Sequence, residues 1–338
     1  MKLVMTLLAR NEADIIDAQI AFHLNAGVDF VVATDNSSDD GTAEILERYE
    51  ELGVLHLIRE AGDDMRQEAW VTRMARLAAT DFGADWVINA DADEFWWPRG
   101  GSLKDVLRLV PERFGVVRGC WRHFVPRPDG PPDFAERMTV RLCRPAFPGD
   151  KSTIYHAHQK VAHRADPEVE IERGNHNAAG HALEPVRGWH PIEVLHFSFR
   201  STEQLAAKAR GGWMRSPEED RTEHQILLDD AFHEGRLDAF YAARSVADSQ
   251  LERGLADGSF ALDTRLRDAL RALRVPDGSY RLPDPEPLLA FDAPDVDDAV
   301  AYAAEASVLA GIDGIVRAER RVAALEARLA GLRRLPRP

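Results

Sequence analysis

Three carboxylates stand close together in the segment Asn89-Ala90-Asp91-Ala92-Asp93-Glu94-Phe95, directly after a short apolar run. Clustered carboxylates repel one another unless a cation lies between them. Oxygen ligands without sulfur favour Mg²⁺ or Mn²⁺, which proteins commonly share with substrate phosphates. A solvated acidic turn is the plain alternative, but the preceding strand and the bulky Phe95-Trp96-Trp97 argue against it. The spacing therefore predicts a metal–diphosphate site at Asp91 and Asp93.

Two further polar segments follow predicted strands. Leu8-Ala9-Arg10-Asn11-Glu12 comes after the first strand, and Asp35 opens a turn-forming run to Thr42 after the second. Arg10 has the reach to meet a phosphate, and a carboxylate at Asp35 accepts hydrogen bonds from a ribose or base. Taken singly, each segment is equally typical of a solvated or capped turn.

Histidines are dense in one stretch, which holds His156, His158, His163, His176, His181, His190 and His196. This density suggests a zinc hydrolase as one hypothesis. However, the sequence has no His-Glu-x-x-His motif, and His156 with His158 specifies no third ligand.

The elements that must position these residues alternate between strand and helix over the first 100 residues. Predicted strands cover 3–9, 30–34, 54–58 and 86–89. One predicted helix is N-capped by Asn11, a second is N-capped by Thr42, and a third covers 67–79. Such alternation is typical of a parallel sheet with helices on both faces, where ligands bind at the carboxyl ends of the strands. Short β-type runs between about 115 and 200 predict a mixed, partly antiparallel extension of the sheet.

The remainder of the chain predicts two appendages. We expect a catalytic domain over 1–200, a helical extension over 201–275, and a Pro-rich linker with a last helix over 276–338. That helix carries a heptad seam at Ile315, Ala318, Val322, Leu325, Leu329 and Leu332. The seam predicts a homodimer. Folding back onto the chain's own domain is the alternative, because the helix is basic and the rest of the chain is acidic.

Composition excludes several classes of protein. The formal net charge is −15, which disfavours binding to nucleic acid. No apolar run is long enough for a membrane helix, so no transmembrane segment is expected. Cys120 and Cys143 cannot form a disulfide framework, so a cytoplasmic location is the default expectation.

The segments "ARNEADII", "TDNSSDDGT" and "WVINADADEF" stand in the order and spacing of the family 2 glycosyltransferases of the GT-A fold, which the chain resembles over residues 1 to about 215. The closest resemblance is to a branch whose acidic motif ends in Asp-Glu-Phe. It implies a mixed α/β sheet flanked by helices and a nucleotide-sugar donor, UDP-linked. It also implies a Mn²⁺ or Mg²⁺ ion on the diphosphate. Asn36 replaces the usual second acid of the nucleotide turn, which leaves the preferred base open.

The resemblance also implies roles for individual residues. The nucleoside would be lined by Ala9, Arg10, Glu12 and Asp35, with Arg66 near the base or diphosphate. Asp91 would face the ribose or the metal, and Asp93 the metal. The stretch from His196 to Arg200 is similar to one in the branch, so that His196 would complete the metal shell and Arg200 would meet phosphate. Gly174-Asn175-His176 resembles another branch segment and would place His176 beside the acceptor.

The implied reaction transfers a sugar to a hydroxyl of a glycan or small-molecule acceptor. The metal neutralises the leaving diphosphate, and a base must take the acceptor's proton. The sequence leaves four candidates for that base, Asp133, Glu136, His176 and Glu193, of which we favour His176 and Glu193. Two alternatives stay open: a sugar-1-phosphate nucleotidyltransferase, disfavoured because Ala9-Arg10-Asn11-Glu12 lacks glycine, and a non-enzymatic scaffold that dimerises through its last helix.

Overall fold

The computed structural model describes residues 1–61, 66–128, 131–146, 153, 155–181, 183–211 and 223–293, with isolated positions between 302 and 325. Residues 1–186 and 190–293 form one compact unit, and 187–189 with 294–338 form another. The sheet and the candidate site belong to the first unit. Half of the predicted heptad seam, Ile315, Leu329 and Leu332, lies outside the described residues, so the homodimer and the three-part division stay predictions.

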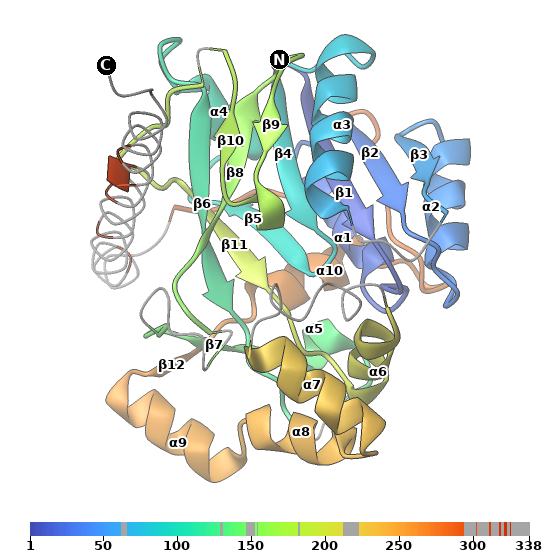
Figure 1. Ribbon diagram of the computed structural model, residues 1–338, viewed down its shortest axis with the longest axis vertical. Coiled ribbons are helices and arrows are strands. Elements are labelled where there is room, and N and C mark those ends of the chain that lie inside the picture. Colours follow the sequence, from blue (N-terminus) through green and yellow to red (C-terminus); the bar gives the residue numbers. More distant parts are fainter. Residues whose placement is uncertain are drawn as a thin grey trace, which may run out of the picture. The chain divides into compact units, whose positions relative to one another are not determined.

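A mixed sheet of eight strands forms the centre of the first unit (Figure 1). Its order is β3 (Leu55–Arg59), β2 (Phe30–Asp35), β1 (Leu3–Ala9), β4 (Trp86–Asp91), β8 (Gln159–Arg164), β6 (Val116–His123), β11 (Ile192–His196) and β5 (Glu94–Pro98). Within it β8 and β5 run antiparallel to their neighbours, and the other strands are parallel to one another. The predicted fold class, a mixed α/β sheet flanked by helices, is confirmed.

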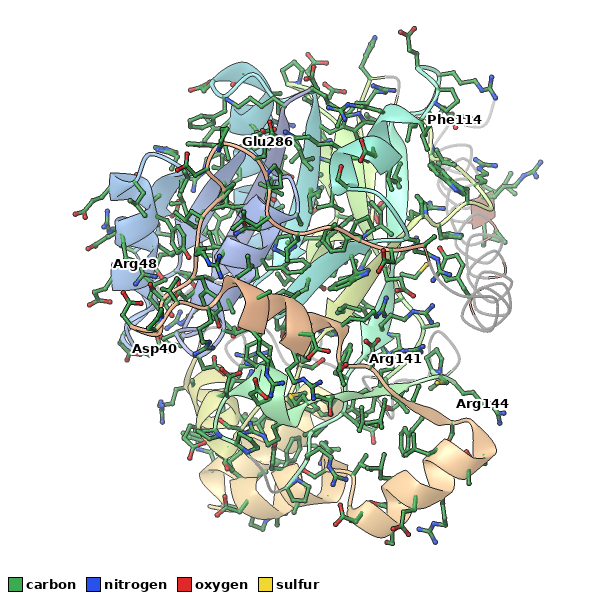
Figure 2. The ribbon with its side chains drawn as sticks, turned by 180° about the vertical axis from the view of Figure 1, so that it is seen from behind. Asp40, Arg48, Phe114, Arg141, Arg144 and Glu286 are labelled. Atoms are coloured by element: carbon green, nitrogen blue, oxygen red, sulfur yellow. The ribbon has the colours of Figure 1, made fainter. Side chains whose placement is uncertain are left out.

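Helices cover both faces of the sheet. This explains why the sequence of β1 is apolar at every position but Thr6. Leu3, Met5 and Leu7 pack in one core cluster with α1 (Ile16–Asn25) and α10 (Arg265–Leu273). Val4 packs in a second cluster with α3 (Gln67–Thr80). Alternate residues of a strand point to opposite faces, so a strand covered on both sides needs apolar residues throughout. Figure 2 shows α10 over the sheet on the face opposite to the view of Figure 1.

Two predicted helix caps are wrong. The N-cap of α1 is Ile15, and Asn11 instead adopts a positive φ of 56° and accepts a hydrogen bond from the Asp39 backbone N–H at 2.9 Å. Gly41 precedes α2 (Thr42–Glu51), while the Thr42 hydroxyl accepts from the Glu12 backbone N–H at 2.8 Å. Both polar side chains therefore join the loop after β1 to the loop after β2.

The remaining elements are short. They are α4 (Leu103–Arg108), α5 (Phe134–Arg137), β7 (Val140–Leu142), β9 (Glu170–Ile171), the 3₁₀ turn η1 (Arg173–Asn175), β10 (Ala178–Ala179), α6 (Thr202–Arg210), α7 (Glu223–His233), α8 (Leu237–Arg244), α9 (Asp248–Asp257) and β12 (Phe260–Leu262). In Figure 1 the arrowheads of β4, β6 and β11 point toward α6, α7 and α8. None of the described helices has the length and apolarity needed to cross a lipid bilayer.

Candidate active site

The carboxyl ends of the parallel strands and the first residues of β8 and β5 meet at one edge of the sheet, called here the carboxyl edge. A cavity of about 580 Å³ opens there, between the strand ends and side chains from α6 and α7. The predicted site residues that line it are Ala9, Arg10, Glu12, Asp91, Asp93, His176 and His196. Segments more than 180 residues apart in the chain therefore contribute to one cavity, as the strand-end argument predicts.

Asp91 is held by a buried lysine that the sequence analysis did not single out. Lys160 donates to Asp91 Oδ2 at 2.5 Å and lies 2.9 Å from Glu94 Oε1. Asn175 and Gln67 donate to the other Asp91 oxygen at 3.1 and 3.4 Å. Burial alone would lower the pKa of Lys160, but Asp91 and Glu94 raise it well above its usual value. A lysine at the start of an apolar strand is the available signal, because a buried lysine needs a carboxylate partner.

Asp93 lines the cavity, and one of its two oxygens accepts no hydrogen bond from a described residue. Lys208 of α6 donates to Asp93 Oδ2 at 3.0 Å, while Oδ1 lies 3.7 Å from His196 Nε2. Burial alone would raise the pKa of Asp93, but Lys208, His196 and Arg200 hold it well below its usual range. Burial lowers the pKa of His196, so its imidazole is neutral near pH 7. An ionised carboxylate and a neutral imidazole thus stand side by side at the cavity wall.

Of Asp91, Asp93 and His196, only some are available as ligands for a divalent cation. Both Asp91 oxygens already accept hydrogen bonds. Asp93 Oδ1 and His196 Nε2 are 3.7 Å apart, too far for a hydrogen bond, and the Ser198 hydroxyl lies 3.1 Å from the same His196 nitrogen. Mg²⁺ and Mn²⁺ sites commonly use one or two protein ligands and complete the shell with water and phosphate oxygens. No group of three or more histidine, cysteine or acidic side chains among the described residues has metal-site geometry. Asp93 therefore fits as a protein ligand, and His196 fits once the rotatable Ser198 hydroxyl turns away from Nε2. Asp91 does not fit without releasing Lys160.

Arg200 and Glu12 form an ion pair beside the cavity. Arg200 is buried; it bonds Glu12 and, through two nitrogens, both oxygens of Asp14 at 2.7 and 2.8 Å. The expectation that Arg200 meets phosphate is not supported, because its guanidinium is occupied by carboxylates and does not line the cavity. Burial raises the pKa of Glu12, although Arg200 and Lys208 oppose the rise. Arg200 instead fixes the loop after β1 against the segment before α6.

The predicted nucleoside residues are only partly brought together. Asp35 pairs in register with Ala9 at the carboxyl edge but does not line the cavity; its Oδ1 is buried and accepts no hydrogen bond from the described residues. Asn36 lines the cavity instead and accepts from Arg10 at 3.2 Å. Arg66 is exposed immediately before α3 and does not line the cavity.

Glu193 does not line the cavity, so the prediction that it acts as the base is wrong. Since β-strand side chains alternate, Glu193 and His196 of β11 point to opposite faces of the sheet. Arg99 and Arg122 donate to Glu193 Oε1 at 2.9 and 2.7 Å, and Arg265 donates to Oε2 at 2.8 Å. Burial alone would raise the pKa of Glu193, but these arginines lower it to about 2. A carboxylate so acidic and so enclosed does not accept a proton from a substrate hydroxyl.

The other two predicted bases are also engaged away from the cavity. Asp133 caps α5 and pairs with Arg274 at 2.6 Å. Glu136 pairs with Arg271. Of the four candidates, only His176 lines the cavity.

Trp121 is in contact with five histidine rings, four of which line the cavity, an arrangement that the sequence spacing does not reveal. His196 stacks on its ring at a centroid distance of 4.3 Å, and the Trp121 Nε1–H donates to Glu94 Oε1 at 2.8 Å. His123, His156, His158 and His176 pack against the indole at larger angles. Because these rings surround the indole, Trp121 is a scaffold for the histidines more than an open platform for a sugar.

Comparison with known families gives a match to glycosyltransferase family 92 over residues 5–115. That range contains the loops after β1, β2 and β4. It supports the expected enzyme class, a glycosyltransferase, while the assignment to family 2 is not confirmed. A glycosyltransferase-like protein of Arabidopsis thaliana is 21% identical over 236 residues, which are 56% of this chain and 52% of that protein. The chain thus spans about half the length of this curated relative.

Solved structures show distant similarity. S. aureus TarS (residues 1–349) in complex with UDP is 14% identical, with 69% of this chain and 71% of that chain covered and a TM-score of 0.32. Glucosyl-3-phosphoglycerate synthase from Mycobacterium tuberculosis, in complex with Mn²⁺, UDP and phosphoglyceric acid, is 20% identical. There 36% of this chain and 43% of that chain are covered, with a TM-score of 0.26.

Proposed function

We propose that this chain transfers a sugar from a nucleotide-diphosphate donor, UDP-linked, to a hydroxyl acceptor, with Mn²⁺ or Mg²⁺ held by Asp93 and His196. The observation that carries the proposal is the cavity at the carboxyl edge, where Asp93 Oδ1 and His196 Nε2 lie 3.7 Å apart. The family match over residues 5–115 supports the reaction class. A bound cation would neutralise charge on the departing diphosphate.

The protein's own cations suit an anionic ligand. Arg10, Lys160, Arg173 and Lys208 line the cavity together with three carboxylates, Glu12, Asp91 and Asp93. Among the described lining residues, cations therefore exceed carboxylates by one, in a chain whose net charge is −15. Lys208 already bonds Asp93, so it stands where a diphosphate oxygen on the cation would arrive. Donors fixed in place before the ligand binds stabilise developing negative charge without reorganisation.

His176 is the residue that we assign to the acceptor. It lines the cavity, and burial lowers its pKa well below the usual value, with further lowering by His158 and Lys160. A ring that stays neutral near pH 7 offers a lone pair to an incoming hydroxyl at every working pH. We propose that His176 contacts the acceptor hydroxyl.

Unfolding measurements in the presence of UDP or UDP-GlcNAc test this function. With Mn²⁺ present, ligand at about 100 times its Kd is expected to raise the free energy of unfolding by about 2.7 kcal/mol. Chelator is expected to abolish the gain, and so is the Asp93→Asn substitution. Equal stabilisation with chelator present would reject the role of the cation. Absence of stabilisation by every nucleotide and nucleotide sugar would reject the function itself.

A further inference from the structure

Two histidines of the cavity are stacked face to face. His158 lies just before β8 and His176 just after η1, and their ring centroids are 3.6 Å apart with planes at 20°. Both line the cavity, and both present an edge to Trp121, at centroid distances of 5.3 and 5.5 Å. The pair is therefore held rigidly in the cavity wall.

The backbone of one residue, Gln159, sets the two rings in opposite tautomers. The Gln159 N–H donates to His158 Nδ1 at 2.9 Å, so the proton of that neutral ring is on Nε2. The Gln159 carbonyl lies 2.8 Å from His176 Nδ1, which must donate because a carbonyl only accepts. His176 Nε2 is therefore a bare acceptor. The pair offers one N–H donor and one lone pair.

Neither Nε2 atom has a hydrogen-bond partner in the part of the chain that the structure describes. No described residue bonds His158 Nε2 or His176 Nε2, and neither atom is sealed from solvent. Gly174 keeps the His176 edge open, because a Cβ at position 174 would lie 2.5 Å from Nε2. A larger residue at position 174 would cover the acceptor.

Both rings stay neutral. Burial lowers the pKa of His158 to about 3, with His156, Lys160 and His123 adding to the effect. Burial, His158, Lys160 and His156 lower the pKa of His176 in the same direction. Tautomers set by the backbone therefore persist through the physiological range.

We propose that His158 and His176 together bind a sugar or polyol hydroxyl, with His158 Nε2–H donating a hydrogen bond to its oxygen and His176 Nε2 accepting a hydrogen bond from its O–H. A hydroxyl is both donor and acceptor and satisfies the two nitrogens at once. A phosphate or carboxylate only accepts hydrogen bonds, so it has no hydrogen atom to offer to the lone pair on His176 Nε2. An ammonium only donates and meets the N–H of His158. The inference rests on the proposed function and adds that this part of the cavity selects a neutral hydroxyl.

The proposed function assigns the acceptor hydroxyl to His176; a hydroxyl of the donor sugar has the same chemistry, and the test separates the two sources. His158→Phe and His176→Phe keep the stacked ring and remove the polar atoms, while His158→Gln and His176→Gln restore an amide N–H or C=O near the Nε2 position. His233→Phe, at an exposed site on α7, is the matched control. Binding of UDP, UDP-glucose and UDP-GlcNAc in Mn²⁺ is measured by calorimetry. Glycerol and methyl glucoside are titrated into protein with ¹⁵N-labelled imidazoles.

If the donor sugar is the source, the Phe variants lose about 10-fold in affinity for UDP-sugars and none for UDP, since one hydrogen bond is removed. If the acceptor is the source, methyl glucoside or glycerol shifts both Nε2 resonances in the wild type, and each Phe variant raises the half-saturating concentration about 10-fold. The Gln variants recover part of either loss.

Phe variants that bind every probe as the wild type does would overturn the proposal, and so would ¹⁵N spectra that show the same tautomer in both rings. A wild-type protein that binds neither UDP nor UDP-sugars would reject the proposed function alone, because the polyol titration still reports on the pair.

Discussion

Asp93 and Glu193 are both buried carboxylates held ionised by cations, yet their surroundings differ. Both oxygens of Glu193 are covered by guanidinium groups of Arg99, Arg122 and Arg265. Asp93 has Lys208 on one oxygen only, and the other faces His196 and the cavity. The comparison teaches that a depressed pKa does not identify a catalytic acid or base. The two groups differ in access: one oxygen of Asp93 faces a cavity that a ligand can enter, whereas both oxygens of Glu193 are covered by arginines.

The largest expected effect falls on the Asp93 side of this comparison. Asp93→Asn removes charge from the proposed cation site and is expected to lower kcat/KM at least about 10⁴-fold, or about 5.4 kcal/mol. The free energy of unfolding is expected to fall by less than in Glu193→Gln, because one lysine, and not three arginines, loses its hydrogen-bonded carboxylate partner. Steady-state UDP release and urea unfolding measure the two quantities. Turnover within 10-fold of the wild type would contradict the assignment.

Glu193→Gln is the reverse case. It leaves three arginines facing a neutral amide, so the free energy of unfolding is expected to fall by roughly 3–5 kcal/mol. The remaining folded protein keeps its KM for the donor, because Glu193 does not line the cavity. Urea unfolding gives the first value and donor titration the second. A loss of turnover at unchanged stability would restore Glu193 as a candidate base.

The pH dependence of stability tests the same ion cluster without a mutation. Since the folded pKa of Glu193, about 2, lies below its usual value of 4.5, its contribution is fully present above pH 4.5. As pH falls from 4.5 toward 2, up to roughly 3 kcal/mol is lost. Urea unfolding between pH 6 and pH 3 is expected to show a smaller acid loss in Glu193→Gln than in the wild type. Parallel curves for the two proteins would contradict the assigned shift.

A smaller effect is expected at the rim of the arginine cluster. Arg265 is the most exposed of the three arginines, and it also bonds Asp263. Arg265→Met leaves Arg99 and Arg122 on Glu193, so we expect a loss of about 1–2 kcal/mol in the free energy of unfolding. Arg122→Met, at a fully buried position, is the matched comparison and should cost more. Equal losses would show that burial does not determine how much each ion pair contributes to the free energy of unfolding.

The local elements could be predicted because each has a short-range signal. The apolar run Leu3–Ala9 predicts a doubly covered strand, and the strand–helix alternation predicts which ends meet. That reasoning brought Ala9, Asp91 and Asp93 to one cavity. It failed at Asn11 and Thr42, where a local capping rule competed with hydrogen bonds between two loops.

Strand periodicity and like-charge clustering are local properties, so they were enough to predict the class of sheet, the edge that carries the site and the acidic segment at its centre. Which cation faces which carboxylate depends on packing between segments that are far apart in the chain. Lys160 and Lys208 reach Asp91 and Asp93 across 69 and 115 residues of chain. Glu193 and His196 are three residues apart, yet one is enclosed by arginines and the other faces the cavity. The alternation of side chains along β11 separates them, and what covers each face is fixed by packing from distant segments.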